Sequence, residues 1–336
     1  MVKYLKYLIS LVIAIAILWY LFKDEDIPAM LQQAKSANYS WILLSISMAL
    51  TSHWLRAYRW KLFVKPLGFE ISVFRSFLAV MIGYVSNLVL PRMGEVIKCG
   101  ALKKMENVPV SKSFGTIITE RIIDLVFLAV VLGLTFLLEY GRLKNYLYNL
   151  LGNKYQEMAG NLAIGYWLLI LLLVLVAGVV WMYKKRQVFR NYPLYINLAN
   201  FTKNVLEGLT SIKKINNQWG FWGSSVAIWL LYYTMSYVVV FAIPETSGLS
   251  PIAGLTILAA GSIGMTAPVQ GGMGAYHFMV STVLVLYGID LSDGKLLATI
   301  IHTSQSVGVI LVGVASLFIS GTLQKRNQPE VAITPD

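Results

Sequence analysis

The sequence predicts an all-α polytopic membrane protein, with about six full transmembrane helices and two re-entrant or broken helical hairpins. Of the 336 residues, 57% are hydrophobic and 13% are charged, whereas ordinary soluble domains have about 45–50% and 25%. Mean hydropathy is +0.65, and several apolar runs reach the roughly 20 residues that a helix needs to cross the hydrocarbon. These runs are too long and too continuous for the short alternating strands of a transmembrane β-barrel.

Six apolar segments are long enough to cross the membrane. The first ends in aromatic residues and a lysine rather than in a small-residue cleavage site, which favours a retained helix over a signal peptide. Two further apolar regions, Ser76–Leu90 and Pro251–Ala267, each stop at a proline, and we expect them to form broken hairpins. The six expected spans are Leu5–Phe22, Trp41–Tyr58, Phe114–Leu138, Leu162–Tyr183, Trp222–Ile243 and Lys295–Gly321.

Charge bias predicts the topology, because cytoplasmic loops carry an excess of Lys and Arg. If both termini are cytoplasmic and both hairpins are re-entrant, most of the 28 basic residues lie on the cytoplasmic side of the membrane. The first hairpin then opens inwards and the second outwards. Three spans per half would make residues 1–140 and 160–321 an inverted repeat, as in many transporters. Eight full transmembrane helices are the alternative.

We expect a single transmembrane domain over residues 1–321, followed by a disordered cytoplasmic tail over 322–336. The span that ends at Trp54–Trp60 carries Arg56 and Arg59 one turn apart, and this pattern predicts an aromatic and basic anchor at the inner surface. One cysteine, Cys99, excludes an intramolecular disulfide. The net charge is +12. The distribution of the basic residues along the chain indicates that this charge reflects membrane topology rather than nucleic-acid binding.

Two short motifs place ionisable side chains where the neighbouring residues predict lipid. A charge in the middle of a membrane helix costs about 2.5–3.5 kcal/mol on insertion scales, so such groups pair with one another or line a cavity. Arg121 can pair with Asp124 at i,i+3, and Glu120 shares a helix face with Asp124. The motifs indicate either a structural ion-pair network or, as we expect, a lining for a charged lipid headgroup. The candidate headgroup-binding residues are Asn87, Arg92, Glu95, Glu120, Arg121 and Asp124.

Proline and glycine mark the tips of both hairpins. The second cluster lacks the Lys-Ser/Thr ending and the preceding strand of a nucleotide phosphate loop, so we interpret it as a tight turn. Gln270, His277 and His302 are candidates for proton or headgroup contacts, since imidazole titrates near neutral pH. The alternative for both histidines is a packing role. The predicted tip residues are Pro91, Gly94, Pro268, Gly271, Gly272 and Gly274.

These motifs together resemble the flippase-like membrane domain of lysylphosphatidylglycerol synthases, in a stand-alone form without the aminoacyl-transferase domain. The resemblance covers nearly the whole chain, and it implies a membrane protein that moves a polar lipid between leaflets. The chain departs from the family at His277, where relatives often have an acid, and near His302, where relatives often have an arginine. The motifs that carry the resemblance are Asn87-x-x-x-Pro91-Arg92-x-Gly94-Glu95, Glu120-Arg121-x-x-Asp124 and Pro268-x-x-Gly271-Gly272-x-Gly274.

The sequence therefore predicts the flipping of a polar-headgroup lipid between leaflets of the bacterial inner membrane. Phospholipids, aminoacyl-phospholipids and lipid-linked glycans are the substrate classes, and membrane lipids are the expected partners. No catalytic order of side chains and no metal spacing stands out, so we expect neither an enzyme nor a cofactor. The alternatives are a non-transporting subunit or scaffold for an envelope lipid-modifying enzyme and, less favoured, a proton-coupled solute transporter.

Overall fold

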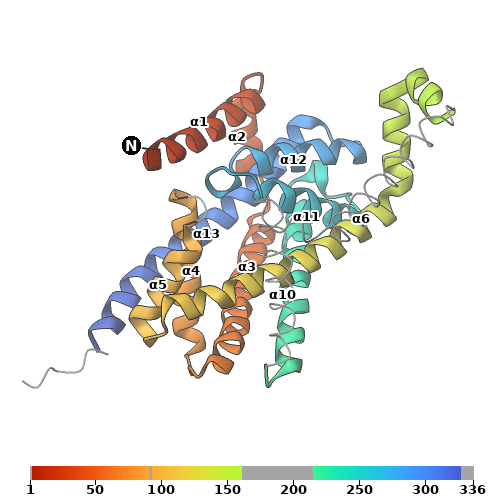
Figure 1. Cartoon of the computed structure of the whole chain (residues 1–336). Helices are drawn as coiled ribbons and strands as arrows, with labels where there is room; N and C mark the ends of the chain where they lie inside the picture. Colours follow the sequence, from red (N-terminus) through yellow and green to blue (C-terminus); the bar gives the residue numbers. More distant parts are fainter. Residues whose placement is uncertain (1, 91–92, 161–214, 327–336) are drawn as a thin grey trace, which may run out of the picture. The chain divides into compact units, whose positions relative to one another are not determined.

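The computed structural model describes residues 2–90, 93–160 and 215–326, and this part of the chain contains helices and no strand (Figure 1). The predicted all-α class is confirmed. The chain divides into two compact units, one of residues Met1–Thr135 with Ser211–Asp336 and one of Phe136–Thr210. In the second unit the structure describes only the continuation of helix α6. The predicted span Leu162–Tyr183 lies outside the described residues.

The same order of elements, a helix, a helical hairpin and a helix, occurs twice along the chain. The inverted relation between the two halves stays a prediction. Two helices, α1 (Val2–Phe22) and α2 (Ile27–Lys35), come before the first set. The first set is α3 (Tyr39–Val64), α4 (Val73–Val89), α5 (Gly94–Glu106) and α6 (Val110–Gly160), and the second is α10 (Gln218–Val238), α11 (Pro251–Met265), α12 (Ala275–Leu284) and α13 (Leu291–Arg326).

Three helices among the described residues are long and apolar enough to cross a membrane, which makes the chain a membrane protein. They cover Val110–Arg142, Gln218–Ala242 and Leu291–Leu323. The first and third contain the predicted spans Phe114–Leu138 and Lys295–Gly321, and the second covers all of Trp222–Ile243 except its last residue. At about 1.5 Å per residue α3 is long enough as well, but its serines, arginines and histidine make it less apolar. The total of six spans therefore stays a prediction.

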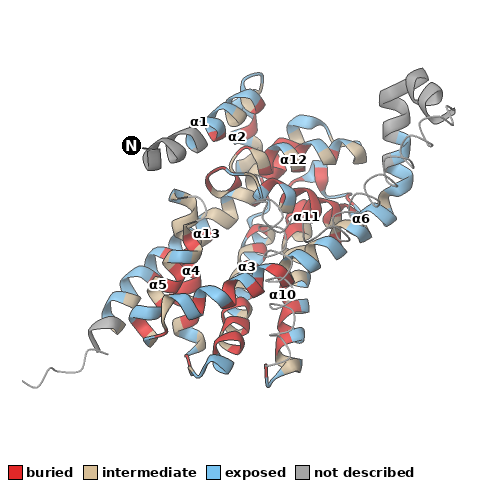
Figure 2. Ribbon diagram, in the orientation of Figure 1, coloured by how far each residue is buried: buried red, intermediate tan, exposed pale blue. Residues whose placement is uncertain are grey.

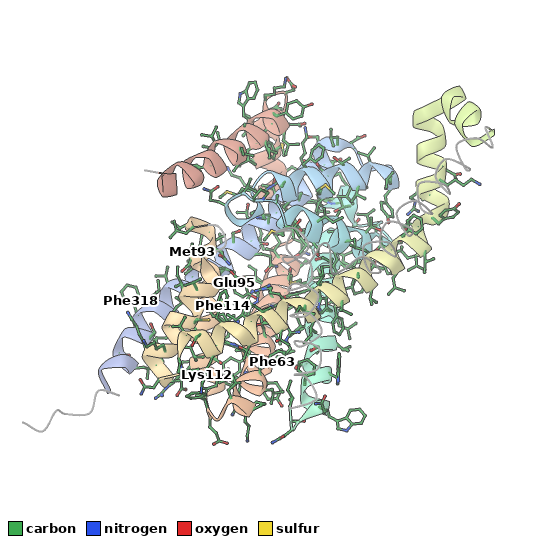
Figure 3. All side chains as sticks on the ribbon, viewed as in Figure 1. Phe63, Met93, Glu95, Lys112, Phe114 and Phe318 are labelled. Carbon is green, nitrogen blue, oxygen red and sulfur yellow. The ribbon has the colours of Figure 1, made fainter. Side chains whose placement is uncertain are left out.

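Helix α13 continues to Arg326, five residues beyond the boundary that we expected at 321. The predicted tail therefore begins inside a helix, and residues 327–336 lie outside the described part. In the extension, Leu323 packs against a cluster of buried apolar side chains. Earlier in the helix, Phe318 is 76% exposed (Figure 3). Helix α6 also has exposed stretches (Figure 2), and they include apolar residues such as Leu125 and Val130. Such exposed apolar side chains fit surfaces that face lipid.

In the first predicted hairpin, α4 and α5 pack closely against each other. A β-carbon placed on Gly83 would lie 2.9 Å from the carbonyl oxygen of Gly94. The Asn87 side-chain oxygen accepts a hydrogen bond of 2.7 Å from the Gly94 backbone N–H, which satisfies one of the donors left unpaired at the start of α5. Pro91 and Arg92, between the two helices, lie outside the described residues.

The second hairpin consists of α11 and α12, again with a glycine at the closest approach. A β-carbon on Gly264 would lie 2.7 Å from the Tyr276 Cα atom. Between the helices, Gly271, Gly272 and Gly274 have φ angles of +55°, +74° and +78°, which glycine adopts without steric cost. These are the residues at which the sequence predicts the turn.

The tips of the two hairpins contact each other. A β-carbon on Gly271 would lie 2.7 Å from the Leu88 Cδ2 atom at the end of α4. From α13, the His302 Nε2 atom lies 2.8 Å from the Gly271 carbonyl oxygen, and α13 also packs along both α4 and α12. Helix α13 therefore holds the region where the hairpins meet.

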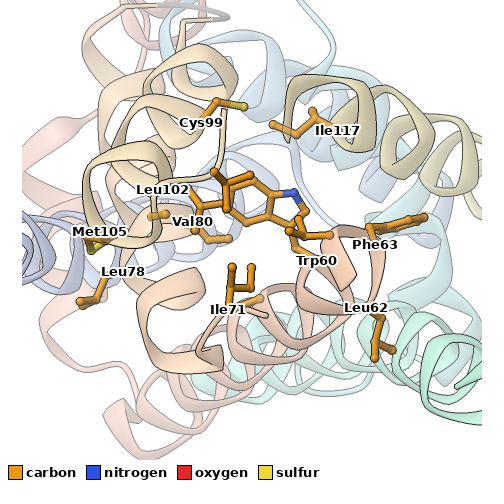
Figure 4. Close-up of a cluster of buried hydrophobic side chains, with 14 of the residues drawn as sticks. Trp60, Leu62, Phe63, Ile71, Leu78, Val80, Cys99, Leu102, Met105 and Ile117 are labelled. Atoms are coloured by element: carbon orange, nitrogen blue, oxygen red, sulfur yellow. The ribbon is translucent and has the colours of Figure 1, made fainter. Parts of the chain in front are cut away.

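A hydrophobic cluster around Trp60 joins α3, α4, α5 and α6 (Figure 4). The fully buried Trp60 indole N–H donates a hydrogen bond of 2.9 Å to the Thr116 hydroxyl on α6. The Lys98 ammonium of α5 lies 4.0 Å from the centre of the indole ring, a cation–π distance. This packing fixes the helices that carry the candidate site.

After the end of α1, hydrogen bonds to Glu25 connect the α1–α2 loop to α13. The Lys295 ammonium donates to Glu25 at 2.6 Å, and the Ser292 hydroxyl donates to the same carboxylate at 2.7 Å. The hydrogen bond from Lys295, followed by that from Ser292, lowers the pKa of Glu25. The charged form of Glu25 therefore stabilises this contact.

We predict that Gly264→Ala destabilises the protein by about 1–3 kcal/mol, because the new methyl group has to displace backbone atoms of α12. Thermal unfolding in nanodiscs measures the effect. Gly223→Ala is the matched control, since a β-carbon there meets nothing within 4 Å, and we expect it to change stability by less than about 1 kcal/mol. Equal stability of the two variants would contradict the close packing of α11 against α12.

We predict that Glu25→Gln lowers stability at pH 7 by about 1.5–3 kcal/mol, the usual contribution of hydrogen bonds to a charged group. The native pKa of Glu25 is depressed, so its contribution is present above the unfolded pKa of about 4.3 and is lost as pH falls through the native pKa. Thermal unfolding against pH should show the two proteins converging in acid. The control is Asp24→Asn, whose side chain is 83% exposed; a constant difference at all pH values for Glu25→Gln would exclude the ionic contribution.

Candidate functional site

Glu120 lies on α6 ten residues after the helix begins, about 15 Å along its axis. Its side chain is fully buried. One carboxylate oxygen accepts from Arg56 of α3 at 2.7 Å, and the other accepts from Lys98 of α5 at 3.1 Å. Three helices are therefore joined through this one carboxylate.

Asp124, one turn further along α6, is held by both arginines of α3. Its two oxygens accept from Arg56 at 2.8 Å and from Arg59 at 2.7 Å. From α10, the Tyr232 hydroxyl accepts from Arg56 at 3.0 Å and the Ser225 hydroxyl accepts from Arg59 at 3.3 Å. We name Arg56, Arg59, Lys98, Glu120 and Asp124 the ionic cluster.

The two arginines of α3 lie in the ionic cluster and do not form the predicted anchor. The sequence predicts Arg56 and Arg59 at the inner surface, but they are only 4% and 0% exposed. They are buried because both acids of α6 face them, and a buried carboxylate requires a cation. In the sequence, the signal for this pairing is the i,i+3 spacing of Arg56 and Arg59 together with the i,i+4 spacing of Glu120 and Asp124. Arg56, Arg59, Lys98 and Tyr232 were not among the predicted site residues.

Arg121 and Glu95 form a second ion pair at the edge of the cluster, and we name them the edge pair. Their nearest charged atoms lie 3.2 Å apart, whereas Arg121 is 3.8 Å from Asp124. The predicted Arg121–Asp124 contact is thus present but longer, because Asp124 already binds two arginines. The side chains of Arg121 and Glu95 are 46% and 27% exposed, so this pair can exchange partners more readily than the buried cluster can.

A small cavity lies beside the edge pair. Its volume is about 10 Å³, close to what one water molecule needs, so a lipid headgroup does not fit in this conformation. Its lining combines both members of the edge pair with Lys98 and the tip of the first hairpin. The lining residues are Val80, Gly83, Tyr84, Asn87, Gly94, Glu95, Lys98 and Arg121.

The ionic cluster and the edge pair contain four cations and three carboxylates, which leaves a net charge of +1. The Nε–H groups of Arg56 and Arg59 are buried and donate to no acceptor in the described part of the chain. Donors therefore exceed acceptors in this region, which favours an anionic ligand over a cationic one.

The remaining predicted residues lie at the hairpin tips. The Asn87 side-chain oxygen accepts from the Gly94 backbone N–H, and headgroup binding by Asn87 stays a prediction. Arg92 lies outside the described residues and stays a predicted ligand. Pro268 is exposed, whereas Gln270 is 5% exposed.

Two histidines form a separate group at the second hairpin. The ring centres of His277 on α12 and His302 on α13 lie 4.9 Å apart. His53 is not part of this pair, since its ring centre lies 4.6 Å from that of Tyr84 of α4, with an angle of 45° between the ring planes. The structure therefore divides the predicted site residues between an ionic region at the first hairpin and an imidazole pair at the second.

Two archaeal proteins are similar to parts of the chain. One is a UPF0104 membrane protein of Pyrococcus horikoshii, 32% identical over 141 residues, which make up 41% of each chain. The other is a UPF0104 membrane protein of Methanocaldococcus jannaschii, 28% identical over 120 residues, 35% of this chain and 34% of the relative. The matched segments thus span less than half of either relative. No solved structure matches the chain.

The three motifs at the hairpins and on α6 resemble the membrane domain of lysylphosphatidylglycerol synthases, and a comparison with family models gives the same family. The model of the lysylphosphatidylglycerol synthase TM region matches residues 7–313, so the chain belongs to this family of membrane proteins.

Proposed function

We propose that the protein flips a lipid with an anionic or zwitterionic headgroup between the leaflets of a bacterial inner membrane, without covalent chemistry. The observation that carries the proposal is the cation excess around a cavity formed by the first hairpin and α6. Both termini are proposed to be cytoplasmic. Anionic phospholipids, aminoacyl-phospholipids and lipid-linked glycans all carry a phosphate that such a site would bind.

The buried ionic cluster and the edge pair have different roles in this proposal. The cluster joins α3, α5 and α6 through contacts of 2.7–3.4 Å between fully or nearly fully buried groups, and hydrogen bonds to Tyr232 and Ser225 attach it to α10. It would therefore supply a fixed positive field. Arg121 is half exposed and has one close acid. A guanidinium can donate two parallel hydrogen bonds to a phosphate, so Arg121 would exchange Glu95 for the headgroup.

Headgroup entry requires the cavity to widen, and the edge pair is the contact that would have to open. Arg121 lies on α6 and Glu95 in the first turn of α5, so their separation would free the tip of the first hairpin, while the Lys98–Glu120 pair keeps the rest of α5 joined to α6. Glu95, once released, would accept hydrogen bonds from an amine or a sugar of the headgroup.

The acyl chains would stay beside the apolar surfaces of the helices while the headgroup crosses. A groove of about 610 Å³ lies between α1, the end of α11 and the start of α12, and its lining is almost wholly apolar. The exposed apolar side chains of α6, such as Leu125 and Val130, extend this kind of surface. The lining residues of the groove are Ile13, Ala16, Ile17, Tyr20, Ile263, Gly264, Thr266, Ala267, Ala275, Phe278 and Met279.

We predict that Arg121→Gln slows the transfer of a fluorescent phosphatidylglycerol in liposomes about tenfold or more. The reason is that the variant loses one charge-assisted hydrogen-bond contact to the headgroup, which contributes about 1.5–3 kcal/mol. Arg121→Lys should lose part of the rate, since Lys keeps the charge but not the planar fork. Thermal unfolding should differ little from that of the wild type.

The matched control is Arg75→Gln, which removes an arginine of α4 that is paired with Glu106 at 3.2 Å. It should transfer lipid at the wild-type rate. Wild-type transfer by Arg121→Gln would exclude Arg121 as a ligand. If the folded wild type moves no lipid at all, the scaffold function is favoured instead.

We predict that Glu120→Gln is destabilised by about 3–5 kcal/mol, because Arg56 and Lys98 would lose their shared buried carboxylate. Thermal unfolding in nanodiscs measures this loss. Glu70→Gln, whose side chain is 81% exposed beside Lys65, is the control and should cost about 0–1 kcal/mol. A Glu120→Gln protein of wild-type stability that fails to move lipid would assign the carboxylate to the ligand instead of to the fold.

A further inference from the structure

The imidazole pair of His277 and His302 lies where the second hairpin meets α13. The ring centres are 4.9 Å apart with an angle of 58° between the ring planes. The His302 Nε2 atom is 2.8 Å from the carbonyl oxygen of Gly271 at the hairpin tip. His277 is 5% exposed, and its Nδ1 atom is buried without a hydrogen-bond partner among the described residues.

The surroundings of the pair are apolar or aromatic. Tyr276 of α12 lies 5.2 Å from His302 and 6.2 Å from His277 between ring centres, and Phe22 of α1 lies 6.3 Å from His277. Helix α11 contains no ionisable residue. One turn further along α13, Gln305 donates to the Ser45 hydroxyl of α3 at 2.8 Å. Within the described ranges no carboxylate or cation is paired with either ring, and the Tyr276 phenol is the other titratable group in contact with them.

Such a pair can hold one proton but not two. A proton on either ring brings a positive charge to a site with no acid beside it, and a second proton would place two like charges 4.9 Å apart in an apolar region. The unpartnered His277 Nδ1 atom is an available acceptor for the first proton, and the neighbouring ring lies close enough to share it.

The hydrogen bond to Gly271 depends on the protonation of His302. A carbonyl oxygen only accepts, so the Nε2 atom has to carry a proton for this bond to form. In a charged imidazole both nitrogens carry protons, and the bond is always available. In a neutral imidazole the proton can move to Nδ1, and the Nε2 lone pair then faces the carbonyl oxygen and repels it. Protonation therefore strengthens the attachment of the tip to α13, and loss of the proton permits its release.

The attached tip is in contact with the first hairpin. Gly271 has a φ of +55°, and the Leu88 side chain lies against the position where a β-carbon would be. A change in the attachment of Gly271 thus alters the surface that the first hairpin meets. The edge pair and the small cavity are at that first hairpin.

We propose that His277 and His302 form a one-proton site that fastens the tip of the second hairpin to α13 more strongly when occupied than when empty. Its use to drive transport rests on the proposed lipid flipping, whereas proton binding and tip attachment do not. The ligand of this site is the proton itself.

Proton binding is tested by ¹⁵N NMR of histidine-labelled protein in nanodiscs between pH 4 and 8. The chain has three histidines, so His53→Gln, His277→Gln and His302→Gln assign every ring. We expect the ring nitrogens of His277 and His302 to shift over the same pH range, with one proton taken up by the pair. Independent titration of both rings to full protonation, or no titration of either, would overturn the proposal.

Tip attachment is tested by a spin label on Thr266→Cys in a Cys99→Ala background, since Thr266 is exposed beside the tip. The label should become less mobile on acidification from pH 8 to pH 5, and the change should disappear in His302→Gln, because glutamine still donates to Gly271 but does not titrate. His53→Gln is the matched control and should keep the pH response. A wild-type response in His302→Gln, or a wild type without any response, would overturn the attachment.

Lipid transfer measured at the same pH values separates this inference from the proposed function. A pH-dependent tip in a protein that moves no lipid would leave the proton site intact and exclude flipping. Lipid movement with no proton uptake by the pair would exclude the proton site and leave flipping intact.

Discussion

A carboxylate inside an apolar helix has no water to solvate it, and the arrangement of the first helices follows from this constraint. Glu120 and Asp124 both lie on α6, and a buried carboxylate needs a cation beside it. The cations therefore have to come from other helices. Arg56 and Arg59 do so from α3 and Lys98 from α5. The hydrophobic packing around Trp60 joins the same helices, so apolar and ionic contacts favour one arrangement.

Backbone polar groups meet the same constraint where the helices are interrupted. A helix that is interrupted leaves N–H and C=O groups without partners inside the helix, and these groups need other partners. At the first break the Asn87 side chain satisfies Gly94, and at the second break His302 binds the carbonyl of Gly271. Glycine at the close approaches, as at Gly264, lets the two legs of a hairpin pack tightly. The two interruptions are thus stabilised by different chemistry, an amide at one and an imidazole at the other.

The helical class and the positions of both hairpins could be predicted from the sequence, because apolar runs, proline and glycine are local signals. The partners of the charged residues could not. Arg56 was predicted at the surface because an arginine near the end of an apolar helix usually extends to the interface, and only the fold brings it to Glu120. Arg121 was assigned to Asp124 by its i,i+3 spacing, yet its nearer acid is Glu95 on another helix. Local spacing in the sequence identifies the charged residues of such a site, whereas the tertiary contacts determine which of them pair.

The contact between Leu88 and Gly271 has a consequence for any movement of the hairpin tips. Because Gly271 has no side chain, the Leu88 side chain packs directly against the turn of the second hairpin. Packed protein interiors transmit small displacements. A movement of either tip towards the other therefore has to displace the Leu88 side chain or the glycine turn, so the two hairpins are mechanically coupled at this contact.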